Sequence, residues 1–379
     1  MRDDEGALRS ALPEGVRARF VRTGTGLDMH VLEAGRLEPG RKTILLLHGF
    51  PELAYSWRRV MPGLAAAGYH VIAPDQRGYG RTAGWSRGYD VDLAEFGMPA
   101  LARDALALLE AMGVGSVAAV IGHDFGSPVA AWCGMMRPDV FRSVICMSAP
   151  FAGAPVWPAA PEPDIHKALA ALPKPRRHYQ WYYGERRANA DMMEAPEGLT
   201  AFLRAYFHCK SGDWAENAPF RLRGWTADEL AKLPRYYIMD HGASMAETAA
   251  AMAPTPGEAT ACQWLNKDDL AVYAAEYGRT GFQGGLNWYR RATSDAGKEE
   301  LRLYAGKRLS VPAAFVGGAR DWGVFQVPGA LEAMETTACE DYRGTTLVAG
   351  AGHWVQQEAP RAVIAAASSF LQTLRGARL

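Results

Sequence analysis

An aspartate stands between two glycines in the stretch V-I-G-H-D-F-G-S, residues 120–127. Gly122 and Gly126 flank Asp124 two residues away on each side, the spacing of a sharp strand-to-helix turn that exposes a nucleophilic side chain. Alone, such a stretch could also form an ordinary turn. A serine here would attack an acyl carbon, whereas a carboxylate can displace a leaving group from a saturated carbon and form an alkyl ester. Asp124 therefore predicts a substrate with a tetrahedral electrophilic carbon.

Two further residues complete a possible catalytic triad with this nucleophile. Asp321 follows the apolar segment 312–316, and His353 follows the apolar segment 345–348. Taken separately, Asp321 could be a helix cap or a surface carboxylate, and His353 a structural loop histidine. The chain order of nucleophile, acid and histidine, each after a predicted strand, instead favours a triad. In that triad Asp321 orients the imidazole and His353 deprotonates the water that hydrolyses the ester.

The loop H-G-F-P-E, residues 48–52, follows the apolar segment 43–47 and could bind an oxyanion. The backbone N–H of Phe50, together with that of Phe125 directly after the nucleophile, could stabilise the charge that develops when water attacks the ester. The segment D-Q-R-G-Y-G, residues 75–80, is expected to be a turn that supports this loop and not a catalytic element.

A mostly parallel sheet is the scaffold that would bring these loops to one edge. Short apolar segments alternate with helical patterns, which predicts a doubly wound α/β fold. The expected buried strands are residues 43–47, 70–73, 117–121, 143–147, 312–316 and 345–348, and the clearest helices are 101–113 and 359–375. Two further strands, within 17–23 and 27–33, are expected to form an antiparallel hairpin on the edge of the sheet.

From residue 151 to residue 298 the rhythm of strands disappears and helical patterns rich in proline, tryptophan and tyrosine replace it. We interpret this segment as a helical lid inserted into an α/β core made of residues 1–150 and 299–379. Six of the 11 tryptophans and nine of the 15 tyrosines lie in the lid. They could form an aromatic pocket wall or simply pack the lid against the core.

Composition restricts the partners that we expect. Lysine plus arginine equals aspartate plus glutamate at 41 each, which favours neither nucleic acid nor an anionic membrane surface. The N-terminus lacks the apolar stretch of a signal peptide, and no run reaches the roughly 18 apolar residues of a membrane helix. The five cysteines have no metal-ligand spacing, and their odd number favours reduced thiols. We therefore expect a cytoplasmic protein with no metal or organic cofactor; the oligomeric state is left open.

Two leaving groups fit an aspartate nucleophile, an epoxide oxygen and a halide. The epoxide oxygen leaves as an alkoxide still attached to the substrate, so it needs a proton donor, and a tyrosine phenol is suited to that task. A halide instead needs indole N–H groups, an amide or an arginine.

The motifs H-G-F-P-E, D-Q-R-G-Y-G, G-H-D-F-G, H-Y-Q-W-Y-Y (178–183), G-F-Q-G-G-L-N-W-Y-R (281–290) and G-H-W occur in the order seen in one family. From about residue 20 to its end, the sequence resembles a soluble epoxide hydrolase of the α/β-hydrolase superfamily. The resemblance implies that Tyr289 and Tyr179 donate to the epoxide oxygen, with Tyr182 as the alternative to Tyr179. It also implies that Glu52 helps to hold the hydrolytic water, although Glu52 could equally be a residue at a helix start.

The resemblance implies an α/β-hydrolase fold and the conversion of a hydrophobic epoxide, with water, to a vicinal diol. One departure concerns Phe125, where this family usually has tryptophan, so the pocket loses an indole N–H and halide binding is disfavoured. A haloalkane or haloacid dehalogenase with the same nucleophile is one alternative, although the typical asparagine after H-G is missing. An inactive hydrolase fold that only binds a ligand is another, but no member of the triad is missing.

Overall fold

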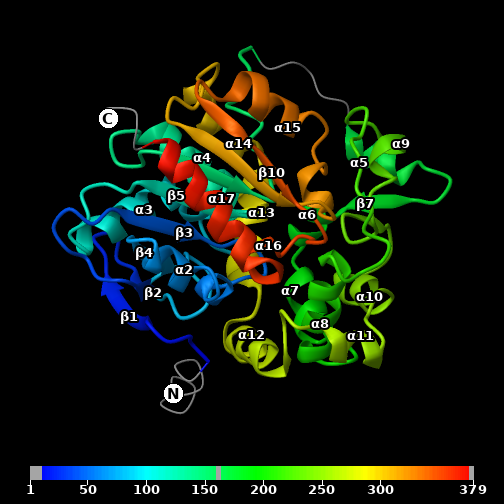
Figure 1. Ribbon diagram of the computed structural model, residues 1–379. Helices are drawn as coiled ribbons and strands as arrows, with labels where there is room; N and C mark the ends of the chain where they lie inside the picture. The colour runs from blue at the N-terminus through cyan, green and yellow to red at the C-terminus, as the bar shows by residue number, and fades with distance from the viewer. Residues whose placement is uncertain (1–10, 159–163, 375–379) are drawn as a thin grey trace.

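Eight strands form one sheet in the order β1-β2-β4-β3-β5-β6-β9-β10 (Figure 1). The computed structural model describes residues 11–158 and 164–374. Every neighbouring pair from β4 to β10 is parallel, and β2 pairs antiparallel with both β1 and β4. The strands are β1 (Val16–Arg22), β2 (Asp28–Ala34), β3 (Thr43–Leu47), β4 (His70–Pro74), β5 (Ala119–His123), β6 (Val144–Met147), β9 (Ala313–Gly318) and β10 (Tyr342–Val348).

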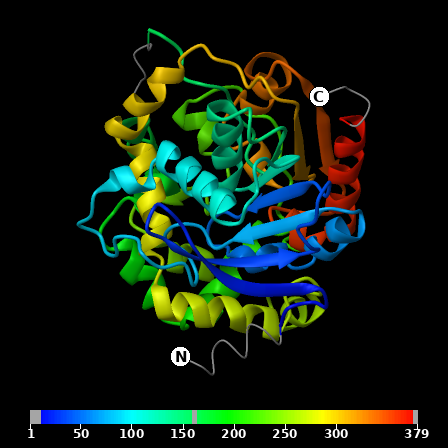
Figure 2. The ribbon, with the colours of Figure 1, turned by 90° about the vertical axis from the view of Figure 1, so that its left-hand side faces the viewer.

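Helices cover both faces of this sheet, as the doubly wound pattern predicted (Figure 2). Alternate residues of β3 belong to two separate apolar clusters: Leu45 and Leu47 to one, Ile44 and Leu46 to the other. The first cluster includes residues of α3 (Met98–Ala111) and α4 (Gly126–Met136), and the second those of α2 (Met61–Ala66) and α17 (Pro360–Thr373). Both faces of the central strands are buried, so these strands are apolar throughout.

The expected strands and helices are present with shifted ends. The antiparallel hairpin at the sheet edge is confirmed, and the predicted helix 101–113 begins earlier, with a proline in its first turn. The strand expected at 345–348 was predicted to be buried, and that prediction is wrong. β10 begins at Tyr342 and contains only half-buried and exposed residues, because it lies at one edge of the sheet and has a neighbouring strand on one side only. Residue 375, the last of the predicted closing helix, lies outside the described residues.

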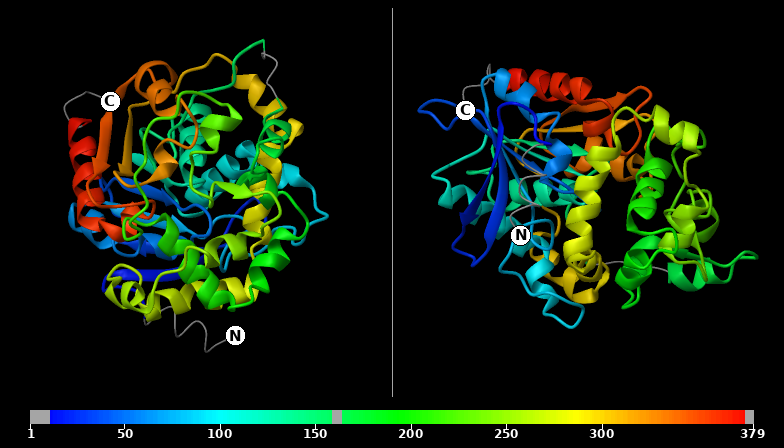
Figure 3. Two further views of the ribbon diagram at one scale, coloured as in Figure 1. Left: turned by 90° about the vertical axis from the view of Figure 1, so that its right-hand side faces the viewer. Right: turned by 90° about the horizontal axis from the view of Figure 1, so that it is seen from below.

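The chain between β6 and β9 forms a mainly helical insertion beside the core (Figure 3). It includes two strands that the sequence pattern did not predict, β7 (Arg176–His178) and β8 (Ile238–Asp240), which pair antiparallel. Strands of three residues are too short to produce an alternating pattern. The helices are α5 (Ile165–Ala170), α6 (Tyr179–Tyr183), α7 (Ala188–Met193), α8 (Leu199–Lys210), α9 (Ala227–Leu230), α10 (Met245–Ala250), α11 (Pro256–Ala261), α12 (Lys267–Thr280), α13 (Gln283–Thr293) and α14 (Asp295–Leu301).

Short helical turns complete the core: η1 (Ala54–Trp57), η2 (Leu93–Phe96), η3 (Arg302–Tyr304), η4 (Trp322–Val324), α15 (Ala330–Ala333), the π-helical turn η5 (Met334–Ala338) and α16 (Val355–Glu358).

Parts of the domain ranges expected from the sequence, residues 1–10, 159–163 and 375–379, lie outside the described residues. The position of the insertion, after β6 and before β9, puts it next to the carboxyl ends of the strands that carry the predicted site residues.

Glycines let the insertion approach the core backbone closely at two places. A Cβ added to Gly284 in α13 would overlap the carbonyl oxygen of Gly78, and one added to Gly78 would lie 2.7 Å from the carbonyl carbon of Gly284. A Cβ on Gly352 would likewise overlap the backbone of Gly212, just after α8. These two contacts hold α13 and the end of α8 against the loops of the core.

Candidate active site

The turn between β5 and α4 presents Asp124 at the carboxyl edge of the sheet. Asp124 has a φ of 50°, a left-handed conformation that is rare for residues other than glycine and typical of an exposed nucleophile in a tight turn. A Cβ on Gly122 would overlap the carbonyl oxygen of Gly126, and one on Gly126 would overlap that of Leu47. The glycine spacing seen in the sequence is therefore required for packing, and the strand, turn and helix occur as expected.

The two oxygens of the Asp124 carboxylate have different partners. Oδ1 accepts a hydrogen bond from the backbone N–H of Phe50 at 2.8 Å, and Oδ2 lies 3.3 Å from Nε2 of His353. Asp124 is only 5 % exposed. Burial alone would raise the pKa of Asp124, but His353 and the ammonium of Lys210 hold it well below its ordinary value. The nucleophile is consequently an ionised carboxylate with one oxygen already bound.

His353 is held on its other side by Asp321, which follows β9. Nδ1 of His353 lies 3.0 Å from Oδ1 of Asp321, and Oδ1 also accepts the backbone N–H of Gly323 at 2.6 Å. Burial would lower the pKa of His353, but Asp321 and Asp124 raise it to about 9. The structure thus brings Asp124, His353 and Asp321 together, with the histidine between the two carboxylates as expected of a triad.

The loop after β3 faces the nucleophile, as the sequence suggested. The Phe50 N–H points to Oδ1 of Asp124, and the Phe50–Pro51 peptide is cis. Phe125 directly precedes α4 as its N-cap residue, and a Cβ added to Gly49 would lie 2.7 Å from the backbone nitrogen of Phe125. The two N–H groups predicted to bind an oxyanion therefore come from backbone segments that touch each other beside the carboxylate.

Glu52 is fully buried behind this loop. Its Oε2 accepts from the Gly49 N–H at 3.0 Å and lies 2.5 Å from Nδ1 of His123, and its Oε1 accepts from the Gln356 amide at 2.6 Å. Nε2 of His123 lies 2.7 Å from the carbonyl oxygen of His353. Glu52 is therefore not a helix-start residue. It links the oxyanion loop to the loop of the catalytic histidine.

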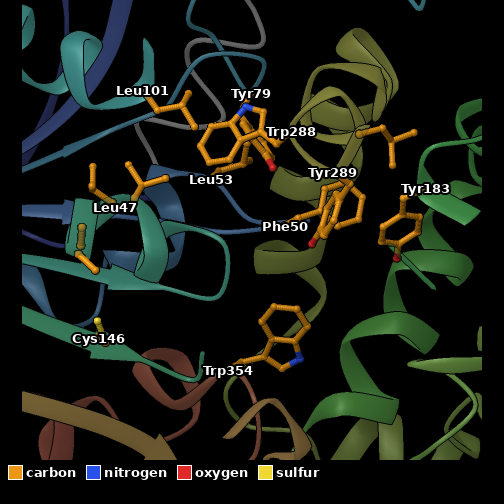
Figure 4. Close-up of a cluster of buried hydrophobic side chains, with 14 of the residues drawn as sticks. Leu47, Phe50, Leu53, Tyr79, Leu101, Cys146, Tyr183, Trp288, Tyr289 and Trp354 are labelled. Atoms are coloured by element: carbon orange, nitrogen blue, oxygen red, sulfur yellow. The ribbon is translucent and has the colours of Figure 1, made fainter. Parts of the chain in front are cut away.

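Aromatic rings from the core and the insertion pack together around Phe50 of the oxyanion loop, with Tyr183 and Tyr289 on the insertion side (Figure 4). The ring of Tyr289 in α13 lies 5.5 Å from that of Phe50, 4.9 Å from that of Phe125 and 5.9 Å from that of Tyr179 in α6. Burial and the nearby Asp124 charge raise the pKa of both tyrosines, so each keeps its phenol proton at neutral pH. The structure brings the two predicted donors together on the insertion side of the site.

Tyr182, the alternative donor, lies elsewhere. Its hydroxyl donates to Oδ2 of Asp191 at 2.9 Å, and the guanidinium of Arg177 lies 4.5 Å from its ring centroid. The hydroxyl of Tyr179 instead lies 3.2 Å from Oε1 of Gln326, in the loop that follows Asp321. The geometry therefore favours Tyr179 over Tyr182 as the second donor.

The segment D-Q-R-G-Y-G supports the oxyanion loop, as the sequence suggested. The backbone N–H of Gln76 donates to Nε2 of His48 at 3.1 Å, and its side-chain amide donates to the carbonyl oxygen of His48 at 2.6 Å. Asp75 accepts the backbone N–H of Ala54 at 2.8 Å. These contacts hold the two ends of the loop that carries Phe50.

Three residues that lie at the candidate site were not singled out in the sequence. Ser148, which directly follows β6, lies 2.5 Å from Oδ2 of Asp321 and 2.7 Å from Nδ1 of His353. Its place at the end of a predicted strand was a usable signal, because that edge of the sheet carries the site. Lys210 and Glu358 gave no such signal, since lysines at helix ends and glutamates in short helices are usually exposed.

Glu358 joins the insertion to the loop of His353. Its Oε2 accepts the backbone N–H groups of Gly212 and Gly352, each at 2.8 Å, and its Oε1 accepts that of Trp354 at 2.9 Å. One carboxylate thereby fixes the end of α8 and both neighbours of the catalytic histidine.

Comparisons with known proteins place this site in context. A family model described as the alpha/beta hydrolase fold matches residues 42–360. Epoxide hydrolase B of Mycobacterium tuberculosis is 35% identical over 92% of this chain and 97% of its own length, and epoxide hydrolase A of that organism is 34% identical over 94% and 97%. An epoxide hydrolase from an endophytic Streptomyces superposes with a TM-score of 0.76 at 30% identity, covering 96% of this chain and 98% of the other. Potato (Solanum tuberosum) epoxide hydrolase I superposes with a TM-score of 0.73 at 28% identity, covering 94% and 99%.

Proposed function

We propose a two-step mechanism from one premise: this chain belongs to the α/β-hydrolase family and is an epoxide hydrolase. Asp124 forms an ester with the substrate, and water activated by His353 then hydrolyses that ester to release a vicinal diol. The observation that carries this proposal is the position of the Asp124 carboxylate, whose Oδ1 binds the Phe50 N–H while Oδ2 lies 3.3 Å from Nε2 of His353.

In the first step, Oδ2 of Asp124 attacks one carbon of the epoxide. The bond between that carbon and the epoxide oxygen breaks, its electron pair stays on the oxygen, and the oxygen takes the phenol proton of Tyr179 or Tyr289. Oδ1 is held by the N–H of Phe50 at 2.8 Å and so becomes the carbonyl oxygen of the new ester. The products of this step are a hydroxyalkyl ester and a tyrosinate.

In the second step, Nε2 of His353 takes a proton from water and the hydroxide bonds to Cγ of Asp124. The charge that develops on Oδ1 is stabilised by the N–H groups of Phe50 and Phe125. The bond between Cγ and Oδ2 then breaks, and Oδ2 leaves as the second oxygen of the diol with the proton from His353. The acid proton left on Asp124 restores the tyrosinate, so every group returns to its starting state.

Two residues position the reacting groups without touching the substrate. Asp321 orients the imidazole through Nδ1, at 3.0 Å, so that Nε2 faces the nucleophile. We assign Glu52 a positioning role for the hydrolytic water, because its carboxylate ties the oxyanion loop to His123, and His123 contacts the backbone of His353.

The surroundings of the nucleophile favour an epoxide over a halide. The indole N–H of Trp288 donates to the carbonyl oxygen of Arg77 at 2.9 Å, and that of Trp354 donates to the carbonyl oxygen of Phe207 at 2.7 Å. Neither indole can therefore donate to a halide in the site. The two tyrosines provide the protonated donors that an epoxide oxygen needs.

We further propose that residues 151–298 act as a cap over the site and that the substrate is hydrophobic. The cap supplies Tyr179, Tyr289 and Lys210, and the rings around the nucleophile offer mostly apolar surface. A cytoplasmic location fits the five cysteines, which are all free. Among the described helices, none has the length and apolar character needed to cross a membrane.

Trapping of the ester tests the mechanism. His353→Gln is incubated with styrene oxide and its intact mass is measured; we expect an increase equal to the mass of the epoxide, carried by the peptide that contains Asp124. Asp124→Asn, whose side chain is a much weaker nucleophile, is the matched control and should show no adduct. Normal turnover by His353→Gln without an adduct would contradict the two-step scheme. Chloride release from 1-chlorobutane by the wild type would support the dehalogenase instead.

A further inference from the structure

Lys210, the last residue of α8, carries a buried ammonium group beside the active site. The residue is only 2% exposed. Among the residues that the structure describes, its Nζ has no carboxylate within ion-pair distance and no hydrogen-bond acceptor. An uncompensated ammonium in a protein interior is costly and is seldom kept without a function. The mechanism proposed above does not yet use it.

Five aromatic rings surround this ammonium. Its Nζ lies 4.7 Å from the ring centroid of Tyr237, 5.1 Å from that of Tyr206, and 5.7 to 5.8 Å from those of Tyr179, Tyr236 and Trp354. The electron-rich faces of aromatic rings attract cations, and this attraction is stronger where water is excluded. The rings offset part of the cost of burial and hold the charge at one place without neutralising it.

The position of this charge is tied to the catalytic histidine. The backbone carbonyl of Lys210 accepts the N–H of His353 at 2.9 Å, and the Glu358 carboxylate binds Gly212 on one side and Gly352 on the other. The backbone of Lys210 is therefore tied to the loop that carries His353, and the surrounding rings hold the ammonium at the end of its side chain. It acts electrostatically on both Asp124 and His353.

We propose that Lys210 is a positioning charge for the second step: its ammonium keeps His353 unprotonated, and so able to accept a proton from water, once Asp124 has become an uncharged ester. This inference rests on the proposed function. It adds a residue that contacts neither the water nor the epoxide and acts through the electric field at the imidazole.

The charges around His353 explain why such a residue is useful. In the free enzyme the carboxylates of Asp321 and Asp124 raise its pKa to about 9, although burial and Lys210 lower it. The imidazole is then mostly protonated at neutral pH and cannot act as a base. Esterification removes the Asp124 charge beside Nε2 but leaves Lys210 in place, so the pKa of His353 falls and its proton passes to solvent before the imidazole takes one from the attacking water.

Besides Asp124, one other group changes its charge in this step, because Tyr179 or Tyr289 becomes a tyrosinate. The ring of His123 lies 5.2 Å from that of His353, and His123 is paired with the buried Glu52 carboxylate. Glu358 lies under the same loop and accepts three backbone N–H groups. Burial raises the pKa of Glu358 to about 7, so its charge also changes within the tested pH range, but it does so equally in every Lys210 variant. Ser148 is uncharged. The negative charge thus moves from the Asp124 carboxylate, whose Oδ2 lies 3.3 Å from Nε2 of His353, to a tyrosine of the insertion, while the positive charge of Lys210 stays.

Lys210 must itself remain protonated for this role. Burial lowers its pKa, whereas Asp124 and Asp321 raise it. Esterification of Asp124 removes one of these supports, so the lysine is expected to lose its proton at alkaline pH before an exposed lysine would. Arginine stays charged throughout this range, which makes Lys210→Arg a charge-preserving comparison.

The test is the pH dependence of ester hydrolysis in single turnovers, measured for the wild type, Lys210→Met, Lys210→Gln and Lys210→Arg. The hydrolysis rate should rise with pH as His353 loses its proton, and we call this rise the acidic limb of the pH profile. For Lys210→Met and Lys210→Gln we expect the acidic limb to move to higher pH by about one unit, and hydrolysis to slow about tenfold at pH 7. Lys210→Arg should keep the acidic limb and extend activity at alkaline pH. Lys167→Met, an exposed lysine of α5, is the control and should match the wild type.

Unchanged acidic limbs in both uncharged variants would overturn the inference, as would a loss confined to ester formation, which would point to a role in substrate binding. Thermal melts identify a variant that fails to fold. If Lys210→Met does not fold, the comparison is made between Lys210→Gln and Lys210→Arg. The ester trapped in His353→Gln is the independent check. If the ester forms but the acidic limbs of the Lys210 variants do not move, the proposed function is supported and the proposed role of Lys210 is wrong.

Discussion

The hydroxyl of Ser148 donates to Oδ2 of Asp321 at 2.5 Å, and the hydroxyl oxygen of Ser148 also lies 2.7 Å from Nδ1 of His353. Ser148 has a φ of 66°, a left-handed conformation that turns its side chain toward the triad at the end of β6. The serine therefore fixes the acid and the histidine together. Asp321 has one oxygen for the imidazole and the Gly323 N–H and the other for this hydroxyl.

Replacing Ser148 by alanine should slow ester hydrolysis more than ester formation. The Asp321 carboxylate loses a short hydrogen bond and with it part of its fixed orientation. We therefore expect the hydrolysis rate to fall about tenfold, which is less than the whole contribution of a general base. Rapid-mixing kinetics separate the two steps. Ser143→Ala is the matched control: Ser143 directly precedes β6, and its hydroxyl donates to the Ala118 carbonyl at 2.6 Å. An equal loss in both variants would contradict the assignment.

Removing single tyrosine hydroxyls should distinguish the two proposed donors from their neighbour. Tyr179→Phe and Tyr289→Phe are each expected to slow ester formation at least about tenfold, and the double variant should lose nearly all activity, because the alkoxide then has no acid. Tyr182→Phe loses its bond to Asp191 and should cost about 1 kcal/mol of stability with little change in rate. The single-turnover rate of ester formation is the measurement. A Tyr182→Phe enzyme slower than Tyr179→Phe would reverse the choice.

Stability should depend on pH through His353. Asp321 and Asp124 raise its pKa to about 9 against the lowering effect of burial, while an unfolded histidine titrates near 6.5. The stabilisation from the charged imidazole is complete below pH 6.5 and is lost as pH rises through about 9, up to about 3 kcal/mol. Urea unfolding at several pH values should show this decline in the wild type and a smaller one in His353→Gln. Equal declines would mean that other groups dominate.

Adding one methyl group to Gly284 should displace α13. A Cβ there would overlap the carbonyl oxygen of Gly78, so we expect Gly284→Ala to destabilise the fold by more than about 2 kcal/mol and to impair ester formation through Tyr289. Gly278→Ala is the control in α12: the nearest atom to its added Cβ is 3.8 Å away. That variant should gain about 0.5 to 1 kcal/mol from helix propensity. Similar melting temperatures for the two variants would refute the close contact.

The sequence predicted those parts of the fold and the site that depend on a short stretch of the chain. The glycine spacing around Asp124 predicted the turn because both glycines pack against backbone, and the chain order predicted that His353 and Asp321 would lie at the same sheet edge. The two tyrosine donors came from resemblance, and the structure separates Tyr179 from Tyr182 by where each hydroxyl points.

What the sequence could not supply depends on contacts between distant segments. The pairing of β7 with β8 joins residues about sixty positions apart, and three-residue strands have no periodicity to read. Lys210 appears in the sequence as an ordinary basic residue at a helix end; only the packing of four tyrosines and a tryptophan around it shows that it is buried. Likewise, nothing local indicates that Glu358 binds backbone on two different parts of the chain.

The Glu358 carboxylate couples the integrity of the triad to the seam between the insertion and the core. Because it binds Gly212 of the insertion and Gly352 and Trp354 of the core at once, separating the two parts along this seam would also pull His353 away from Asp124. Separation of the insertion from the core along this seam would therefore have to break these hydrogen bonds before either neighbour of His353 could shift.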